Sequence, residues 1–125
     1  MALKIISIKN DTEDIVEEHV TIKATEDIPD LSVYAIYDMT FSNDGTISNK
    51  NVHLFRFPKM EIKKGNIVYL YTGKNTTNRP VFIEDKEKPE NNKYRLYQNY
   101  DRKIWNKDHD KATLVKIINE YKKDV

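Results

Sequence analysis

The chain has 125 residues, of which 38% are hydrophobic and 33% are charged. This length accommodates one hydrophobic core, so we expect a single domain over residues 1–125. The chain has no Cys, which excludes disulfide frameworks, thiolate metal sites and enzymes with a Cys nucleophile.

The net charge of +1 hides an asymmetry along the chain. Residues 1–50 carry 4 Lys against 10 acidic residues, a net charge of −6, and residues 51–125 carry 17 Lys and Arg against 10 acidic residues, a net charge of +7. The two halves can interleave in a sandwich so that their charges cancel, or they can form a basic face that attracts an acidic partner. The sequence leaves both interpretations open.

The beginning of the chain predicts a strand. The stretch "MALKIISIKN" lacks the apolar segment of a signal peptide. The longest apolar run, "IVYLY" at 67–71, is far shorter than the roughly 18 residues of a membrane span. We therefore expect a soluble, cytoplasmic protein without a membrane span.

Alternation of apolar and polar residues predicts seven strands with turn signals between them. Seven or more short strands in a chain of this length predict an all-β protein, built as an antiparallel β-sandwich of about seven to nine strands. In chain order, the expected strands cover residues 3–9, 17–24, 31–38, 52–57, 66–72, 93–98 and 111–117.

Two segments between or after these strands allow alternatives. The longest weakly patterned stretch, 73–92, is a polar loop around one apolar island, and loops of this length are either functional or mobile. At the end of the chain, Leu114, Ile117, Ile118 and Tyr121 could line one face of a helix. The alternation of "ATLVKI" favours a strand there, followed by a turn and a short return.

The sequence offers few residues for chemistry. No two of the three His have the short spacing of a zinc site, although His19 and His53 could meet from separate strands. Asp108 and Asp110 flank His109 without the regular oxygen ligands of a calcium loop. No Ser lies in a Gly-flanked elbow and no Gly-rich phosphate loop exists. We expect no enzyme activity, no metal and no cofactor, with an enzyme or a metal-binding protein as the remote alternative.

A basic and aromatic stretch, "NKYRLYQNYDRKIW", is a candidate binding site. Aromatic platforms beside positive charge are how many sheets hold single-stranded nucleic acid. The alternative is ordinary sandwich packing, with the cations keeping one strand face in water. The candidate nucleic-acid-binding residues are Lys93, Arg95, Tyr97, Arg102 and Lys103.

The stretch "KIWNKDHDKATL" predicts a self-capped turn. Trp105 closes one strand, Asn106 can adopt a left-handed conformation, and an Asp such as Asp110 can accept backbone N–H bonds before the next strand begins. No metal or catalytic role is needed to explain it.

Three stretches, taken in order, resemble the lamin tail domain, an immunoglobulin-like module of nuclear lamins and of many bacterial and archaeal proteins. They are "VEEHVTIKATEDIPDLSVYAIYD", "HLFRFPKMEIKKGNIVYLYTG" and "IWNKDHDKATLVKI", and the resemblance covers about residues 4–120. Val33 and Tyr34 stand where the family usually has Gly-Trp. The matching family-motif positions, to which the resemblance assigns a structural role, include Phe57, Pro58, Gly65, Trp105, Asn106 and Asp110.

The resemblance implies an immunoglobulin-like sandwich that acts as a non-catalytic interaction module, here a stand-alone member of bacterial type. We expect it to bind a protein partner or to self-associate through exposed strand edges or the 73–92 loop, with nucleic-acid binding as the alternative. Strand alternation and the family pattern together predict a core of Ile6, Ile8, Val20, Ile22, Leu31, Ile36, Leu54, Phe57, Val68, Leu70, Trp105, Leu114 and Ile117.

Overall fold

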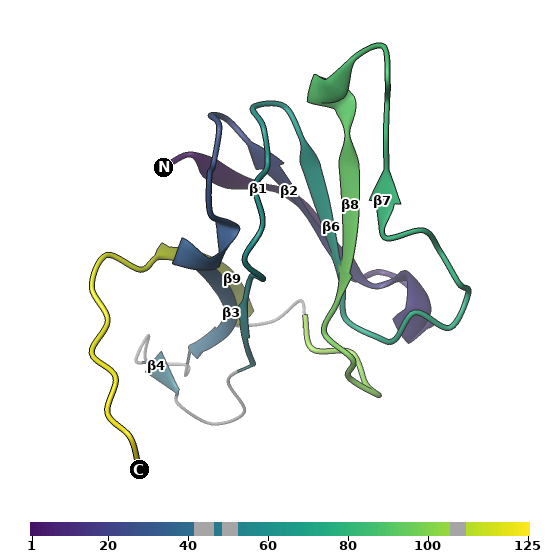
Figure 1. Cartoon of the computed structure of the whole chain (residues 1–125). Helices are drawn as coiled ribbons and strands as arrows, with labels where there is room; N and C mark the ends of the chain where they lie inside the picture. The colour runs from purple at the N-terminus through teal and green to yellow at the C-terminus, as the bar shows by residue number, and fades with distance from the viewer. Residues whose placement is uncertain (42–46, 49–52, 106–109) are drawn as a thin grey trace.

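The structure is a computed structural model and describes residues 1–41, 47–48, 53–105 and 110–125. Two β-sheets pack around one core (Figure 1). One sheet has five strands in the order β1-β2-β6-β8-β7, and in the other β3 pairs with β4, β5 and β9. The strands are β1 (Leu3–Lys9), β2 (His19–Ala24), β3 (Tyr34–Phe41), β4 (Ile47–Ser48), β5 (Leu54–Arg56), β6 (Ile67–Tyr71), β7 (Phe82–Ile83), β8 (Lys93–Tyr97) and β9 (Asp110–Lys116).

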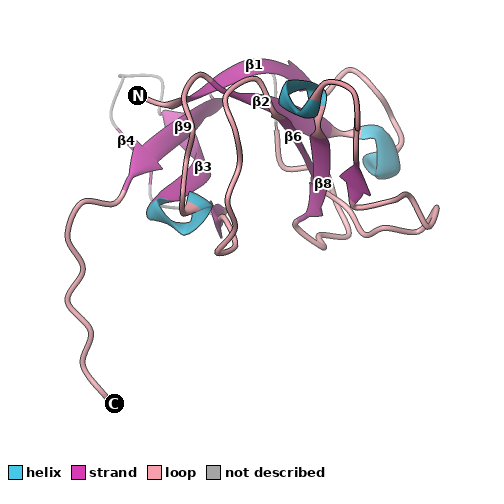
Figure 2. Cartoon of the chain, turned by 45° about the horizontal axis from the view of Figure 1, so that its top comes forward, coloured by secondary structure: helices cyan, strands magenta, loops and turns pink. Residues whose placement is uncertain are grey.

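The predicted all-β sandwich is confirmed, and each of the seven expected strands is present within a few residues of its expected bounds. The described chain adds the two-residue strands β4 and β7 and three short 3-10 turns, η1 (Ile15–Glu17), η2 (Leu31–Val33) and η3 (Pro89–Asn91), which are visible as the only helical segments in Figure 2. Asp14 and Asp30 begin the first two turns, because their side chains accept the backbone N–H of Val16 and Ser32.

One strand pairing differs from the antiparallel expectation. β8 runs parallel to β6, whereas the other pairings among the described strands are antiparallel. Parallel neighbours need a crossover connection of about a dozen residues or more. The long polar stretch 73–92 provides it, so its length has a structural explanation.

The core draws on both sheets. Alternate residues of β2 and β6 point into it, and Tyr34 and Ile36 of β3 meet them from the opposite sheet. Leu114 packs against this cluster while half-buried, and Ile117 is also half-buried. The predicted core residues that are confirmed as buried are Val20, Ile22, Leu31, Ile36, Phe57, Val68, Leu70 and Trp105.

Three predicted core residues are exposed. In β1 the register shifts between Ile5 and Ser7, so the alternation changes phase and Ile6 is 47% exposed. Ile8, further along this edge strand, is 37% exposed. Leu54 is 61% exposed because its neighbour Phe55 packs against the core instead.

The end of the chain also differs from the expectation. β9 is a strand, as predicted, but it is followed by an extended tail over residues 117–125 without the expected turn and return. The tail projects away from the sheets (Figure 1). Ile118 is 84% exposed, so it does not contribute to the core.

The family-motif positions have separate structural roles. Phe57 is buried beside the exposed Pro58, and Gly65 has a positive φ of 92° that only Gly adopts readily. Trp105 is buried in the segment between β8 and β9 rather than at a strand end. Asp110 begins β9, whereas Asn106 and the rest of the predicted turn at 106–109 lie outside the described residues.

A buried carboxylate joins the segment before β2 to two distant parts of the chain. Glu18 is fully buried, and its Oε1 accepts hydrogen bonds from the Thr72 hydroxyl at 2.7 Å and from the backbone N–H groups of Ile104 and Trp105 at 3.0 and 3.2 Å. Hydrogen bonds to an ionised acceptor are among the stronger ones in proteins. In the part of the chain described here, no helix is long and apolar enough to cross a membrane.

Candidate functional site

The five-stranded sheet has an outward surface whose composition is set by its register. Alternate residues of β2 and β6 face the core, so the residues between them face outward. The outward residues of β1, β2, β6 and β8 form three rows, which we call the outer sheet face. The rows are Lys4, Lys23, Ile67 and Lys93; then Ser7, Thr21, Tyr69 and Arg95; and then Lys9, His19, Tyr71 and Tyr97.

The outer sheet face carries positive charge without a matching negative one. No Asp or Glu occupies any position in its three rows, whose charged residues are Lys4, Lys9, Lys23, Lys93 and Arg95. β1 and β2 come from the acidic half of the chain, yet their own charged residues are all Lys. At these strand positions the charges of the two halves therefore do not cancel, and a row of positive side chains attracts anions.

One end of the outer sheet face is packed closed. Tyr71 is only 7% exposed, between the rings of His19 and Tyr97 at centroid distances of 4.8 and 5.4 Å. The guanidinium of Arg79 lies 4.8 Å from the centre of the Tyr71 ring and also pairs with Glu17. Burial lowers the pKa of Arg79, but the hydrogen bond to Glu17 raises it, and the resulting pKa lies above its ordinary value.

Tyr97, one of the predicted contact residues, belongs to this closed end. Its ring stacks on Tyr71 with an interplanar angle of 18°, and its hydroxyl is buried without a hydrogen-bond partner among the described residues. Burial raises the pKa of Tyr97, although the nearby charges of Arg79 and Arg95 oppose the shift. Tyr97 thus contributes packing, and Tyr71 occupies one face of its ring.

The other end of the outer sheet face is more open. Tyr69 is half-buried, with the His19 ring edge-on at 5.8 Å, and Arg95 lies beside it in register on β8. Lys23 is exposed and Lys93 is half-buried in the adjoining row. An aromatic ring bordered by cations is the arrangement that single-stranded nucleic acid uses for stacking and phosphate contact.

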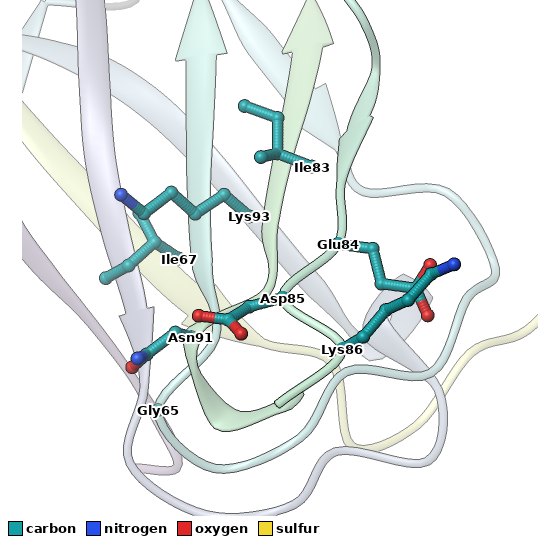
Figure 3. A pocket seen from close by; sticks show the side chains of 8 residues that line it. All are labelled: Gly65, Ile67, Ile83, Glu84, Asp85, Lys86, Asn91 and Lys93. Carbon is teal, nitrogen blue, oxygen red and sulfur yellow. The ribbon is translucent and has the colours of Figure 1, made fainter. Parts of the chain in front are cut away.

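Lys93 lines a hollow at the margin of this open end. The hollow has a volume of about 480 Å³ between the start of β8 and the segment that follows β7. Figure 3 shows Lys93 and Ile67 on one side of it, while the side chains of Glu84 and Lys86 extend in the opposite direction. Asp85 also lines it, and its Oδ1 accepts two backbone N–H groups of its own loop. The mixed charge of this hollow favours no single class of ligand.

The remaining two predicted contact residues lie off the outer sheet face. Lys103 is held by the chain itself, because its Nζ donates to the backbone carbonyls of Asn10 and Thr12 at 2.8 and 2.6 Å. Arg102 is exposed in the segment after β8. Of the five predicted residues, the register therefore brings together Lys93, Arg95 and Tyr97 and leaves the other two apart.

His19 and His53 are associated with different sheets. His19 lies on β2 in the five-stranded sheet, whereas His53 adjoins β5 in the other sheet and hydrogen-bonds through Nδ1 to the buried carboxylate of Asp38 at 2.9 Å. Within residues 1–41, 47–48, 53–105 and 110–125, no group of three or more His, Cys, Asp or Glu could hold a metal ion. His109 is outside the described residues.

Sequence reasoning missed Lys4, Lys23 and Tyr69 as residues that share one sheet face with the predicted basic strand. The signal was present, because each sits at an outward position of an alternating strand. What was missing was the strand order: β2, β6 and β8 are neighbours in space but not in sequence. Comparisons of this chain with family models, with curated proteins and with solved structures found no match.

Proposed function

We propose that the protein is a non-catalytic binding module whose outer sheet face holds single-stranded nucleic acid. The observation that carries the proposal is the register that sets Tyr69 and Arg95 side by side on a surface with five cations and no carboxylate in its rows. Tyr69 offers a ring for base stacking, and Lys23, Lys93 and Arg95 offer charge to phosphates.

Single strands fit this surface better than duplex DNA. A sheet face with a ring at its centre can stack an unpaired base, whereas the bases of a duplex are already stacked on each other. The helical segments among the described elements are three residues long, too short to act as a recognition helix in a major groove. The fold agrees with the sandwich implied by the lamin-tail resemblance, and membership of that family stays a prediction.

Matched substitutions test the proposal. Tyr69→Ala should weaken binding of an eight-nucleotide single strand by about 5- to 150-fold, the range for losing one stacked base. Arg95→Gln should weaken it and reduce its salt dependence. The controls are Tyr121→Ala and Arg102→Gln, which change exposed residues off the outer sheet face. Thermal melts establish that each variant is folded, and equal affinities in test and control variants would reject the proposal.

A second candidate function is self-association through the edge of β1. This strand pairs only with β2, so one of its flanks is without a strand partner in the described chain. Ile6 and Ile8 on it are 47% and 37% exposed. An unpaired edge with apolar side chains is a template for pairing with a second strand.

Sedimentation at increasing protein concentration separates this candidate from the first. The wild-type chain should form a dimer that Ile6→Lys abolishes, since a charge on an edge strand opposes edge-to-edge pairing. Val81→Lys, at a residue that is 52% exposed but lies outside β1, is the control. If the wild-type protein is a monomer at all concentrations, self-association is rejected as its function.

A further inference from the structure

We propose that a hollow at one corner of the outer sheet face is a phosphate-binding site, and this proposal rests on the proposed function. The hollow, here called the lysine hollow, has a volume of about 260 Å³. It is lined by Lys4, Lys23, Ala24, Thr25, Lys64 and Gly65. Because one water takes about 30 Å³, there is room for a tetrahedral oxyanion and several waters.

Two of these lysines face each other in an arrangement that costs stability without an anion. Lys4 and Lys23 are direct partners in the β1–β2 register, and like charges opposite one another on neighbouring strands are destabilising. None of the ion pairs in the described part of the chain involves Lys4, Lys23 or Lys64. A phosphate in the hollow, which the side chains of all three lysines line, would relieve this repulsion.

The turn that carries Lys64 is fixed by its own hydrogen bonds. The backbone N–H of Lys64 donates to Asp27 Oδ1 at 2.9 Å, that of Lys63 donates to Asn66 Oδ1 at 2.9 Å, and that of Gly65 donates to the Ala24 carbonyl at 2.8 Å. The Asp27 carboxylate is thus engaged by the backbone. Since the N–H groups of the turn are occupied, the ligand contacts come from the lysine side chains, on a turn that needs little ordering.

The position of the lysine hollow suits a strand that lies on the open end of the outer sheet face. Lys23 is in register with Ile67, and Tyr69 follows two residues further along β6. Residues two apart in a strand are about 7 Å apart. A nucleotide whose base stacks on Tyr69 therefore has a neighbouring phosphate within reach of the lysine hollow. That phosphate is either an internal phosphodiester or a terminal phosphate.

The test compares oligonucleotides of eight thymidines that carry a 5′-phosphate, a 3′-phosphate or hydroxyl groups at both ends. The variant is K4Q/K64Q, and the control is K59Q/K122Q, which removes the same charge from exposed positions outside the lysine hollow. We expect K4Q/K64Q to bind about 10-fold more weakly than the control at about 50 mM salt, with a salt slope smaller by about 0.7 for each phosphate that the variant no longer neutralises.

The end groups identify the source of the phosphate. If wild-type protein prefers one phosphorylated end and K4Q/K64Q loses that preference, the site takes a terminal phosphate. If wild-type protein shows no preference and K4Q/K64Q loses affinity and salt slope for all three oligonucleotides, the site takes an internal phosphodiester. Equal binding by K4Q/K64Q and K59Q/K122Q, with Tyr69→Ala still impaired, overturns the phosphate site and leaves the proposed function standing.

A titration of wild-type protein with inorganic phosphate makes the result independent of nucleic acid. We expect saturable changes in the amide NMR signals of Lys23 and Lys64 that chloride at the same ionic strength does not produce. Saturation by phosphate without oligonucleotide binding would reject the proposed function and keep the site. Absence of both effects would reject the two proposals together.

Discussion

The carboxylate of Glu18 accepts a hydrogen bond from the hydroxyl of Thr72 at a position fully shielded from solvent. The same carboxylate oxygen holds the backbone N–H groups of Ile104 and Trp105, so one side chain joins three segments that are distant in sequence. No cation pairs with Glu18 among the described residues. Instead of a cation, one O–H and two N–H donors stabilise the carboxylate, as in other buried carboxylates that are hydrogen-bonded rather than ion-paired.

Glu18→Ala should lower the free energy of unfolding by about 3 kcal/mol or more, because it leaves three buried donors without an acceptor. The adjacent Glu17→Ala is the matched control. Glu17 is partly exposed and pairs with Arg79, so its loss should cost less than about 1 kcal/mol. Urea unfolding of both variants measures the difference, and similar losses in the two would contradict the role given to Glu18.

Tyr97→Phe should leave stability at neutral pH unchanged or raise it by up to about 1 kcal/mol. The substitution keeps the stack on Tyr71 and removes a buried hydroxyl without a partner. Unfolding at pH 7 measures this, and a loss of more than about 1 kcal/mol would mean that the hydroxyl has a stabilising contact.

The pH dependence of the same variant follows from the raised pKa of Tyr97. The folded phenol keeps its proton to higher pH than the unfolded one, so its contribution is complete below the unfolded pKa of about 10 and is lost as the pH rises through the folded pKa. The wild-type melting temperature should therefore fall more steeply above about pH 10 than that of Tyr97→Phe. Tyr121→Phe, at an 89% exposed position, should follow the wild type; parallel curves for all three would contradict the shift.

Gly65→Ala should destabilise the protein by about 1–3 kcal/mol. Gly65 has a φ of 92°, and a Cβ there would lie 2.8 Å from the backbone oxygen of Glu90. Gly73→Ala is the control, since its Cβ would meet only ordinary contacts, the nearest at 3.5 Å from Ile15. Thermal unfolding compares them, and an equal effect at both positions would contradict the special requirement at Gly65.

Lys103→Met should cost stability without a selective effect on nucleic-acid binding. Its ammonium donates to two backbone carbonyls of the segment after β1, and removing a charged donor leaves both half-buried acceptors without it. We expect a loss of about 1–2 kcal/mol in urea unfolding. Arg102→Met, one residue earlier and exposed, should change little. If Lys103→Met folds but binds nucleic acid more weakly than the wild type, Lys103 belongs to the nucleic-acid interface and this prediction is wrong.

The sequence predicted the strands better than the interface. Strand positions follow from local alternation, which the β-branched and aromatic residues of this chain display clearly, and all seven expected strands are present. Ile6 was assigned wrongly to the core because a shift of register in β1 is invisible in the alternation itself. The same limit hid Tyr69 and Lys23. Tyr69 lies beside Arg95, and Lys23 shares a row with Lys93, only because β6 and β8 pair in parallel, which the sequence does not specify.

The distribution of charge over the surface also could not be predicted from the sequence. The only Lys, Arg, Asp or Glu residues that the acidic first half contributes to the outward positions of β1 and β2 are Lys, while Glu18 is buried and Asp14 and Asp30 cap short turns. Net charge by halves therefore gave no guide to the surface. Lys103 shows the opposite error: it was predicted to contact nucleic acid, but its ammonium group donates to two backbone carbonyls of the protein itself.

The most direct test of the central claim is the affinity of the wild-type protein for an eight-nucleotide single strand at about 50 and 200 mM salt. If the lysine hollow takes one phosphate and Lys93 and Arg95 neutralise one each, the slope of log K against log salt should be about −2.1, and the affinity should fall by about 20-fold between the two conditions. An absence of binding at the lower salt, or an affinity that does not change with salt, would contradict the account.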